Sequence, residues 1–172
     1  IIGESTKLRI FARKITTIIN AMETNIPQRI VSIREAMRKR QIDAYIIPSS
    51  DPHLSEYPAD RWKSRAWISG FNGSAGTIVV TAEKAGLWTD SRYFLQAEAQ
   101  LAGSGIDLFK MKLPETPSIN EFLLQTLHEG QCVGVDGQCY SAEEAHSLEA
   151  LLGKKGIRLD SSFDLLEEIW ND

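Results

Sequence analysis

Residues 69–97 read SGFNGSAGTIVVTAEKAGLWTDSRYFLQA, and this stretch decides the fold. Gly70, Gly73 and Gly76 recur at every third position, and glycine both accepts a positive φ and lets other backbone approach closely. The β-branched run at 77–81 predicts a strand directly after the glycines. A short polar link leads to a second apolar run at 85–89. We therefore expect an antiparallel pair, because a parallel crossover needs about a dozen residues or more.

The chain leaves this hairpin through Asp90, which stands where a helix N-cap is expected, before a helix over 92–102. An N-cap is a better interpretation of Asp90 than a catalytic acid, because the sequence fixes no second carboxylate opposite it. The glycine spacing does not indicate a nucleotide site. A dinucleotide-binding loop follows a strand and opens a helix, whereas these glycines open a strand.

The rest of the chain alternates helix and strand patterns. Pro27 opens a helix with a regularly spaced apolar face, and Ser118 and Ser141 each begin a capping box, with Glu three residues later. Counting all the patterns gives about six strands and five helices. The expected strands are 44–47, 77–81, 85–89, 106–111, 132–135 and 157–159, and a terminal helix is expected over 163–170. This alternation predicts an α/β fold with three layers, α/β/α, around a mixed sheet of roughly six strands.

Composition limits the classes of function. The chain has 172 residues, a formal net charge of −4 and 42% hydrophobic residues, which suits one globular domain. The negative charge argues against nucleic-acid binding, and no apolar run approaches the length of about 20 residues that a membrane span needs. Cys132 and Cys139 are too few for a disulfide framework, and we expect Cys132 to be a buried thiol. A reducing, cytoplasmic location fits this composition.

The first 24 residues differ in character from the remainder. Apolar residues there follow a helical spacing, and the stretch is basic from Lys7 to Lys14. It is interpreted as an additional helix, as a targeting leader, or as upstream or artificially added sequence with Met22 as the true start. The folded domain is expected to span residues 25–172.

Three separated motifs resemble one family. They are AYIIPSSDPH at 44–53 with SEY at 55–57, WISGFNGSAGT at 67–77, and LWTDSRYFLQA at 87–97. Together they resemble the N-terminal domain of Xaa-Pro aminopeptidases, in the creatinase–prolidase–aminopeptidase P group. That domain has a three-layer fold with a ribonuclease H-like motif. Ser91 departs from the family, which usually has Gly there, and so puts a positive φ at this corner in doubt.

The resemblance implies a metal-dependent parent enzyme that removes an N-terminal residue preceding proline from short peptides. Such enzymes are homo-oligomers, here expected as a homodimer, and hold two divalent metal ions, usually Mn²⁺, in a C-terminal catalytic domain. None of the family's ligand motifs is present here, so no catalytic residue, metal ligand or cofactor is expected in this chain. Its expected partners are short peptides, its own catalytic domain and a second copy, with neither nucleic acid nor membrane. The alternatives are a peptide- or protein-binding module on the same fold, or the N-terminal domain of a Xaa-Pro dipeptidase or creatinase.

Five residues are candidates for the substrate side of the assembled enzyme: His53, Tyr57, Phe71, Trp88 and Arg92. His53 is either a loop histidine bonded to a neighbouring carboxylate or part of the active-site mouth. Arg92 is either solvated, or paired with Asp90 or a loop carboxylate, or able to reach substrate. Trp88 fits a core position, but aromatic residues of this domain in the family can approach a neighbouring subunit's site. Phe71 and Tyr57 are candidates for the same reason.

Overall fold

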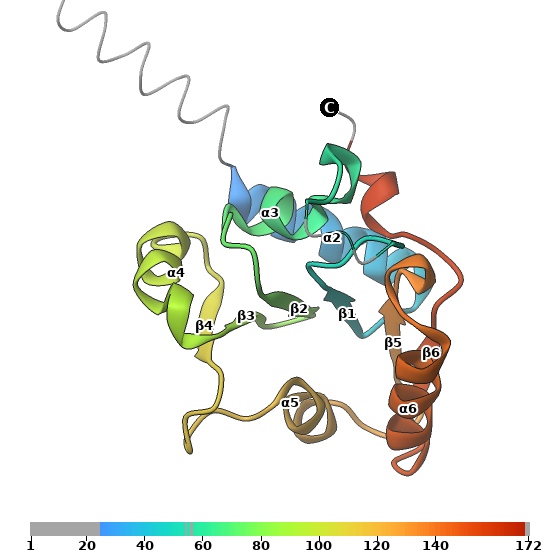
Figure 1. Ribbon diagram of the computed structural model, residues 1–172. Coiled ribbons are helices and arrows are strands. Elements are labelled where there is room, and N and C mark those ends of the chain that lie inside the picture. The colour runs from blue at the N-terminus through green and yellow to red at the C-terminus, as the bar shows by residue number, and fades with distance from the viewer. Residues whose placement is uncertain (1–24, 54, 56, 171–172) are drawn as a thin grey trace, which may run out of the picture.

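The computed structural model describes residues 25–53, 55 and 57–170, so the interpretations of residues 1–24 lie outside the described part of the chain. Within that part, a six-stranded sheet has the order β4-β3-β2-β1-β5-β6 (Figure 1). The strands are β1 Ala44–Ile47, β2 Thr77–Thr81, β3 Ala85–Thr89, β4 Asp107–Lys110, β5 Cys132–Val135 and β6 Arg158–Asp160. The predicted mixed α/β sheet is confirmed.

Strand direction brings the three sequence motifs to one edge of the sheet. β2 pairs antiparallel with both β1 and β3, while β1–β5, β3–β4 and β5–β6 are parallel pairs. The expected 77–81 and 85–89 hairpin is therefore present, with Thr77 opposite Trp88. The carboxyl ends of β1 and β3 lie at the same edge as the start of β2. The chain segments 48–53, 73–76 and 90–93 consequently meet there.

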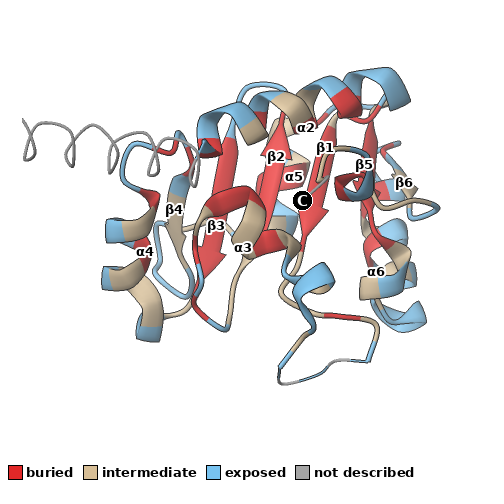
Figure 2. Ribbon diagram, turned by 90° about the horizontal axis from the view of Figure 1, so that it is seen from above, coloured by how far each residue is buried: buried red, intermediate tan, exposed pale blue. Residues whose placement is uncertain are grey.

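Helices cover both faces of the sheet (Figures 1 and 2). Helices α2 Ile26–Arg40, α3 Ser64–Ser69 and α4 Phe94–Leu101 contribute buried side chains to one apolar core, and α5 Ile119–Thr126 and α6 Ala142–Gly153 to the other. Tyr45 and Ile47 belong to the first core, and Ala44 and Ile46 to the second. This alternation is what a strand buried on both faces requires. No helix in the described ranges is long and apolar enough to cross a membrane.

Local signals place the helix boundaries. The Asn25 Oδ1 accepts a hydrogen bond from the Gln28 backbone N–H at 3.2 Å, Pro27 lies in the first turn of α2, and Gln41 ends it with φ +58°. The predicted capping boxes at Ser118 and Ser141 are both present, at the starts of α5 and α6. Because each cap satisfies otherwise free backbone N–H groups, the helices begin where the sequence predicts.

The predicted terminal helix over 163–170 is wrong. Only one 3-10 turn, Leu166–Glu168, forms there, and the Asp164 carboxylate accepts a hydrogen bond from the Leu166 backbone N–H. Such a local side-chain bond competes with helix formation. The segment nevertheless packs closely: Leu165 is fully buried and the Trp170 ring stacks on Trp67 at 5.3 Å between centroids.

Candidate functional site

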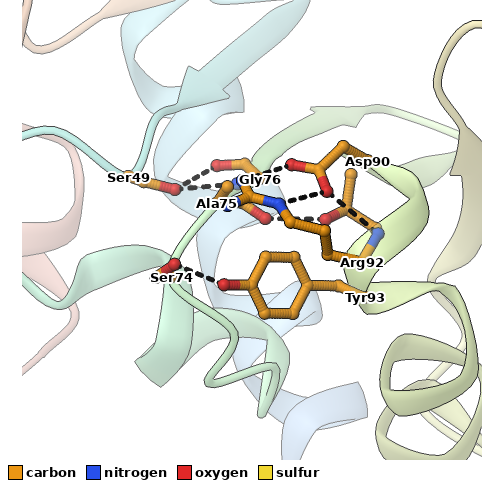
Figure 3. A network of polar contacts seen from close by, with 8 residues as sticks. Ser49, Ser74, Ala75, Gly76, Asp90, Arg92 and Tyr93 are labelled. Carbon is orange, nitrogen blue, oxygen red and sulfur yellow. Dashed lines mark hydrogen bonds and ion pairs between the residues drawn. The ribbon is translucent and has the colours of Figure 1, made fainter.

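The turn at residues 73–76 is held by side chains from distant parts of the chain (Figure 3). Ser49, just after β1, donates its hydroxyl to the Gly76 carbonyl and accepts the Gly76 N–H at 3.0 Å. Thr89, the last residue of β3, donates its hydroxyl to the Ala75 carbonyl at 2.7 Å. Both contacts fix main-chain atoms, so they set the path of the turn independently of its side chains.

Two further side chains complete this attachment. The Tyr93 hydroxyl lies 2.5 Å from the Ser74 hydroxyl, within hydrogen-bond distance. Arg65, on α3, donates from Nη2 to the Gly73 carbonyl at 2.5 Å. Each of the four residues of the turn is therefore bonded to a side chain from a different segment. The motifs that are separate in the sequence form one connected structure.

The glycines of this segment serve two different purposes. Gly70 ends α3 with φ +72°, a conformation that other residues adopt only with strain. At Gly73 the requirement is space, because a Cβ there would lie 2.9 Å from a ring carbon of Phe71 and 2.9 Å from one of Tyr93. Glycine is needed at residue 73 so that the turn can lie against the rings of Phe71 and Tyr93.

The corner after β3 carries a bidentate ion pair. The Asp90 carboxylate accepts the Arg92 backbone N–H at 3.0 Å, Arg92 Nε at 2.9 Å and Arg92 Nη2 at 2.8 Å. These bonds lower the pKa of Asp90 to about 2 and raise the pKa of Arg92. Asp90 is thus ionised at neutral pH and cannot donate a proton as a general acid. It caps the 3-10 turn Ser91–Tyr93, whereas the predicted helix begins only at Phe94, as α4. Ser91 is not among the described residues with positive φ, so serine fits this corner.

The loop after β1 presents two of the predicted residues to solvent. His53 is exposed, and Tyr57 retains 85% of its accessible surface. In the same loop, the carboxylate of the buried Asp51 accepts hydrogen bonds from the backbone N–H groups of Ser55 at 2.8 Å and His53 at 3.0 Å. The Ser55 bond is the main cause of a lowered pKa at Asp51. The loop is shaped by this internal carboxylate, while the His53 and Tyr57 side chains face outward.

The other two aromatic candidates lie in the core. Phe71 is fully buried, and Trp88 is 1% exposed. The Trp88 ring stacks on Phe109 at 4.0 Å between centroids, and its Nε1 donates to the Pro117 carbonyl at 2.8 Å. Neither ring has surface available to a ligand in this chain. The fifth candidate, Arg92, keeps 68% of its side-chain surface accessible and lies on the outside.

A cavity of about 250 Å³ opens beside the 73–76 turn. Its wall includes polar side chains from three segments: Ser49, Ser55, Lys63, Arg65, Asn72 and Ser74. Within the described ranges, the five residues predicted from the sequence do not line it. Sequence reasoning also missed the groups that hold the turn. The sequence offered one signal for them, which is position. The quoted motifs contain Ser49, Thr89 and Tyr93, and Arg65 lies two residues before one of these motifs.

The described residues offer no set of ligands suited to a dinuclear metal centre. No three His, Cys, Asp or Glu side chains among residues 25–53, 55 and 57–170 converge in a way that could hold a metal ion. Cys132 is buried as predicted, and burial raises the pKa of its thiol. A bound metal prefers three or four converging ligands, which this part of the chain does not supply.

Fold, turn and motifs together define one class of protein. Residues 29–169 match the Creatinase/Prolidase N-terminal domain, and the chain belongs to this family. The chain is 45% identical over 151 residues to aminopeptidase P2 of Arabidopsis thaliana, covering 86% of this chain and 21% of that protein. It is 43% identical over 152 residues to a probable Xaa-Pro aminopeptidase P of Tuber melanosporum, covering 87% and 24%. The chain thus spans about a fifth to a quarter of these relatives, at their N-terminal end.

Solved structures agree with this assignment. An X-prolyl aminopeptidase from Caenorhabditis elegans, described as a cytosolic enzyme with a di-nuclear active site, superposes with a TM-score of 0.81 at 30% identity. The match covers 87% of this chain and 26% of that one. The separately crystallised N-terminal domain of the peptidase PepQ from Mycobacterium tuberculosis gives a TM-score of 0.59 at 21% identity, covering 83% and 98%. At this identity the second match shows the fold alone, and it does so for an N-terminal domain that was crystallised by itself.

Proposed function

We propose that this chain is the non-catalytic N-terminal domain of a metal-dependent Xaa-Pro aminopeptidase, where it shapes the substrate cleft. The observation that carries the proposal is 45% identity to aminopeptidase P2 over 86% of the chain, at one end of a much longer relative. Bond cleavage then belongs to the C-terminal catalytic domain of the parent.

The rigid edge of the sheet is suited to a cleft wall. Binding residues are commonly carried on loops that a rigid scaffold positions. Here the 73–76 turn is fixed through main-chain bonds to Ser49 and Thr89, and the neighbouring loop exposes His53 and Tyr57. We assign substrate-side contacts to these two exposed residues and to Arg92. Phe71 and Trp88, which are buried, act on substrate only through the shape of the backbone they support.

The remaining parts of the proposal concern the full-length enzyme. It would hold two divalent metal ions, Mn²⁺ by preference, act in the cytoplasm as a homodimer, and accept short peptides with proline second. The di-nuclear active site of the Caenorhabditis elegans enzyme supports the two metal ions, and its description as cytosolic supports the cytoplasmic location. An N-terminal domain that narrows the cleft would limit the length of the peptide that can enter.

The test compares the 172-residue chain with the full-length protein. Both are incubated with Mn²⁺ and a Xaa-Pro tripeptide, and release of the N-terminal residue is followed by chromatography. We expect turnover by the full-length protein only. In the full-length protein, His53→Ala and Tyr57→Ala should each lower kcat/KM severalfold, mainly through KM, since a wall residue contributes to binding of ground state and transition state alike.

Two outcomes contradict the proposal. Metal-dependent turnover by the 172-residue chain would place the catalytic groups within it. A full-length protein that binds Xaa-Pro peptides without cleaving them would instead support a peptide-binding module on this fold. Glu83→Ala, at the opposite end of β2, serves as the matched surface control and should leave kcat/KM unchanged.

A further inference from the structure

The Arg65 guanidinium is buried and incompletely bonded. The residue is 8% exposed, and its Nε and Nη1 are out of contact with solvent and without a hydrogen-bond partner in the described part of the chain. Burial lowers the pKa of Arg65 to about 10, which still leaves it cationic at neutral pH. A buried charge without acceptors is costly, and such groups in proteins are normally paired. Arg65 therefore requires an acceptor that the described residues do not provide.

The geometry of the guanidinium defines that acceptor. Nη2 carries two hydrogens, one toward each edge of the planar group, and the Gly73 carbonyl occupies one of them. The other Nη2 hydrogen lies beside an N–H that has no partner, so these two parallel N–H groups form one free edge of the guanidinium. Two parallel N–H groups match the two oxygens of a carboxylate. One face of the guanidinium is covered by Phe71, 5.0 Å from its ring centroid, which leaves the edge as the available side.

The surroundings of Arg65 favour a small anion. Arg65 forms part of the wall of the 250 Å³ cavity, together with the hydroxyl groups of Ser49 and Ser74 and the amide of Asn72. Among the described residues, the charged groups of that wall are Arg65 and Lys63, and both are positive. The cavity is smaller than the range of about 300–1,000 Å³ typical of drug-sized ligands. It would accommodate a carboxylate with a few attached atoms.

We propose that this cavity is a carboxylate-binding site whose anchor is the free edge of Arg65, with the Ser74 hydroxyl, which can accept from Tyr93 and donate to the ligand, as an additional donor. The carboxylate comes either from an acidic side chain elsewhere in the full-length protein or from a free peptide or small molecule. A carboxylate reaches Nε or Nη1 of Arg65 only after a neighbouring side chain moves, because both atoms are out of contact with solvent. Lys63 is suited to this, since half of its side chain is accessible and its ammonium is held by the exposed Asp60 at 2.7 Å. Carboxylate binding at Arg65 does not depend on the proposed peptidase function.

Acetate is the probe for the first experiment, with sodium chloride at equal ionic strength as the reference. The related PepQ domain crystallises alone, so the 172-residue chain is a reasonable sample. Its ¹H–¹⁵N spectra are recorded through the titration, following the Arg65 Nε–H, which burial should protect from exchange. We expect a saturable shift with half-saturation on the order of 10 mM, the weak affinity of a four-atom ligand. Chloride should not reproduce it.

Two variants keep the result specific. Arg65→Lys retains the positive charge and loses the two-pronged edge, so acetate affinity, read from the Ser74 backbone amide, should fall at least tenfold. Lys84→Gln removes a positive charge from an exposed position after the opposite end of β2, outside the cavity wall, and its affinity should stay within about threefold of the parent. If Arg65→Lys does not fold, the titration of the unmodified chain still decides the question.

The source of the carboxylate is separated by repeating the titration on the full-length protein. A shift in the 172-residue chain that disappears in the full-length protein identifies an internal acidic side chain as occupant. A shift that persists identifies a site for a free carboxylate. The proposal is overturned if the Arg65 signal does not saturate, or if chloride moves it equally, since a guanidinium solvated by trapped water alone would behave in that way.

Discussion

Truncation of Trp88 tests the conclusion that this residue is structural. Aromatic side chains of this kind bury about 150–250 Å², and at about 25 cal/mol per Å² this corresponds to about 4–6 kcal/mol. Residual burial in the unfolded chain reduces the figure by about 10–40%, and the lost bond to the Pro117 carbonyl adds about 1 kcal/mol. Trp88→Ala should therefore lower the free energy of unfolding by about 4 kcal/mol, within the range of about 3–5 kcal/mol for such changes.

The assay is urea denaturation of the 172-residue chain followed by far-ultraviolet circular dichroism, a signal that comes mainly from the backbone. With a slope of about 2 kcal/mol per M, the midpoint should fall by about 2 M. Trp62→Ala is the control, because Trp62 is only partly buried and should cost markedly less. In the full-length protein, Trp88→Phe keeps an aromatic ring against Phe109 and should retain its kcat/KM.

Either of two results would refute a structural role for Trp88. A loss below about 1 kcal/mol for Trp88→Ala, or one no larger than that of the Trp62 control, would show that the ring is not the packed core element described here. A large drop in kcat/KM for Trp88→Phe at unchanged stability would return Trp88 to the substrate side. The sequence left both interpretations open, and the structure favours the first.

Three further predictions concern the 69–97 segment and a helix cap. Arg92→Gln should raise the pKa of Asp90 from about 2 toward 3.8, as measured by carboxyl ¹³C titration, and an unchanged pKa would show that the ion pair is not its cause. Because the folded-state pKa lies below the unfolded one, the stability that Asp90 contributes is complete above about pH 3.8 and is lost as the pH falls toward 2. Gly73→Ala should cost about 1–3 kcal/mol through overlap with the buried Phe71 ring, and a neutral effect in thermal denaturation would show that the ring can move aside. Ser141→Ala should cost about 1 kcal/mol by removing the N-cap of α6, whereas Ser141→Asp should restore it.

The hairpin and the helix caps follow from interactions between residues that are close together in the sequence. The 85–89 strand must pair antiparallel with 77–81, because the three residues between them cannot cross the sheet. Asp90 caps the next turn, and the capping boxes at Ser118 and Ser141 start their helices, because each involves residues no more than three positions apart. The helix predicted over 163–170 is wrong because contacts with distant residues, which local spacing does not record, decide the conformation of this segment. Apolar spacing there suits a helix, but the segment packs its residues against distant rings such as Tyr45 instead.

What the sequence by itself determined is the α/β class, the hairpin, the caps and, through its motifs, the family. Only the tertiary structure decided that Ser49, Arg65, Thr89 and Tyr93 hold one turn, that Trp88 is enclosed, and that Arg65 keeps an unpaired edge beside a cavity. The physical reason is separation along the chain. A hydrogen bond between residues 27 positions apart, such as that between Ser49 and Gly76, depends on strand order and direction, which no periodicity within either segment records.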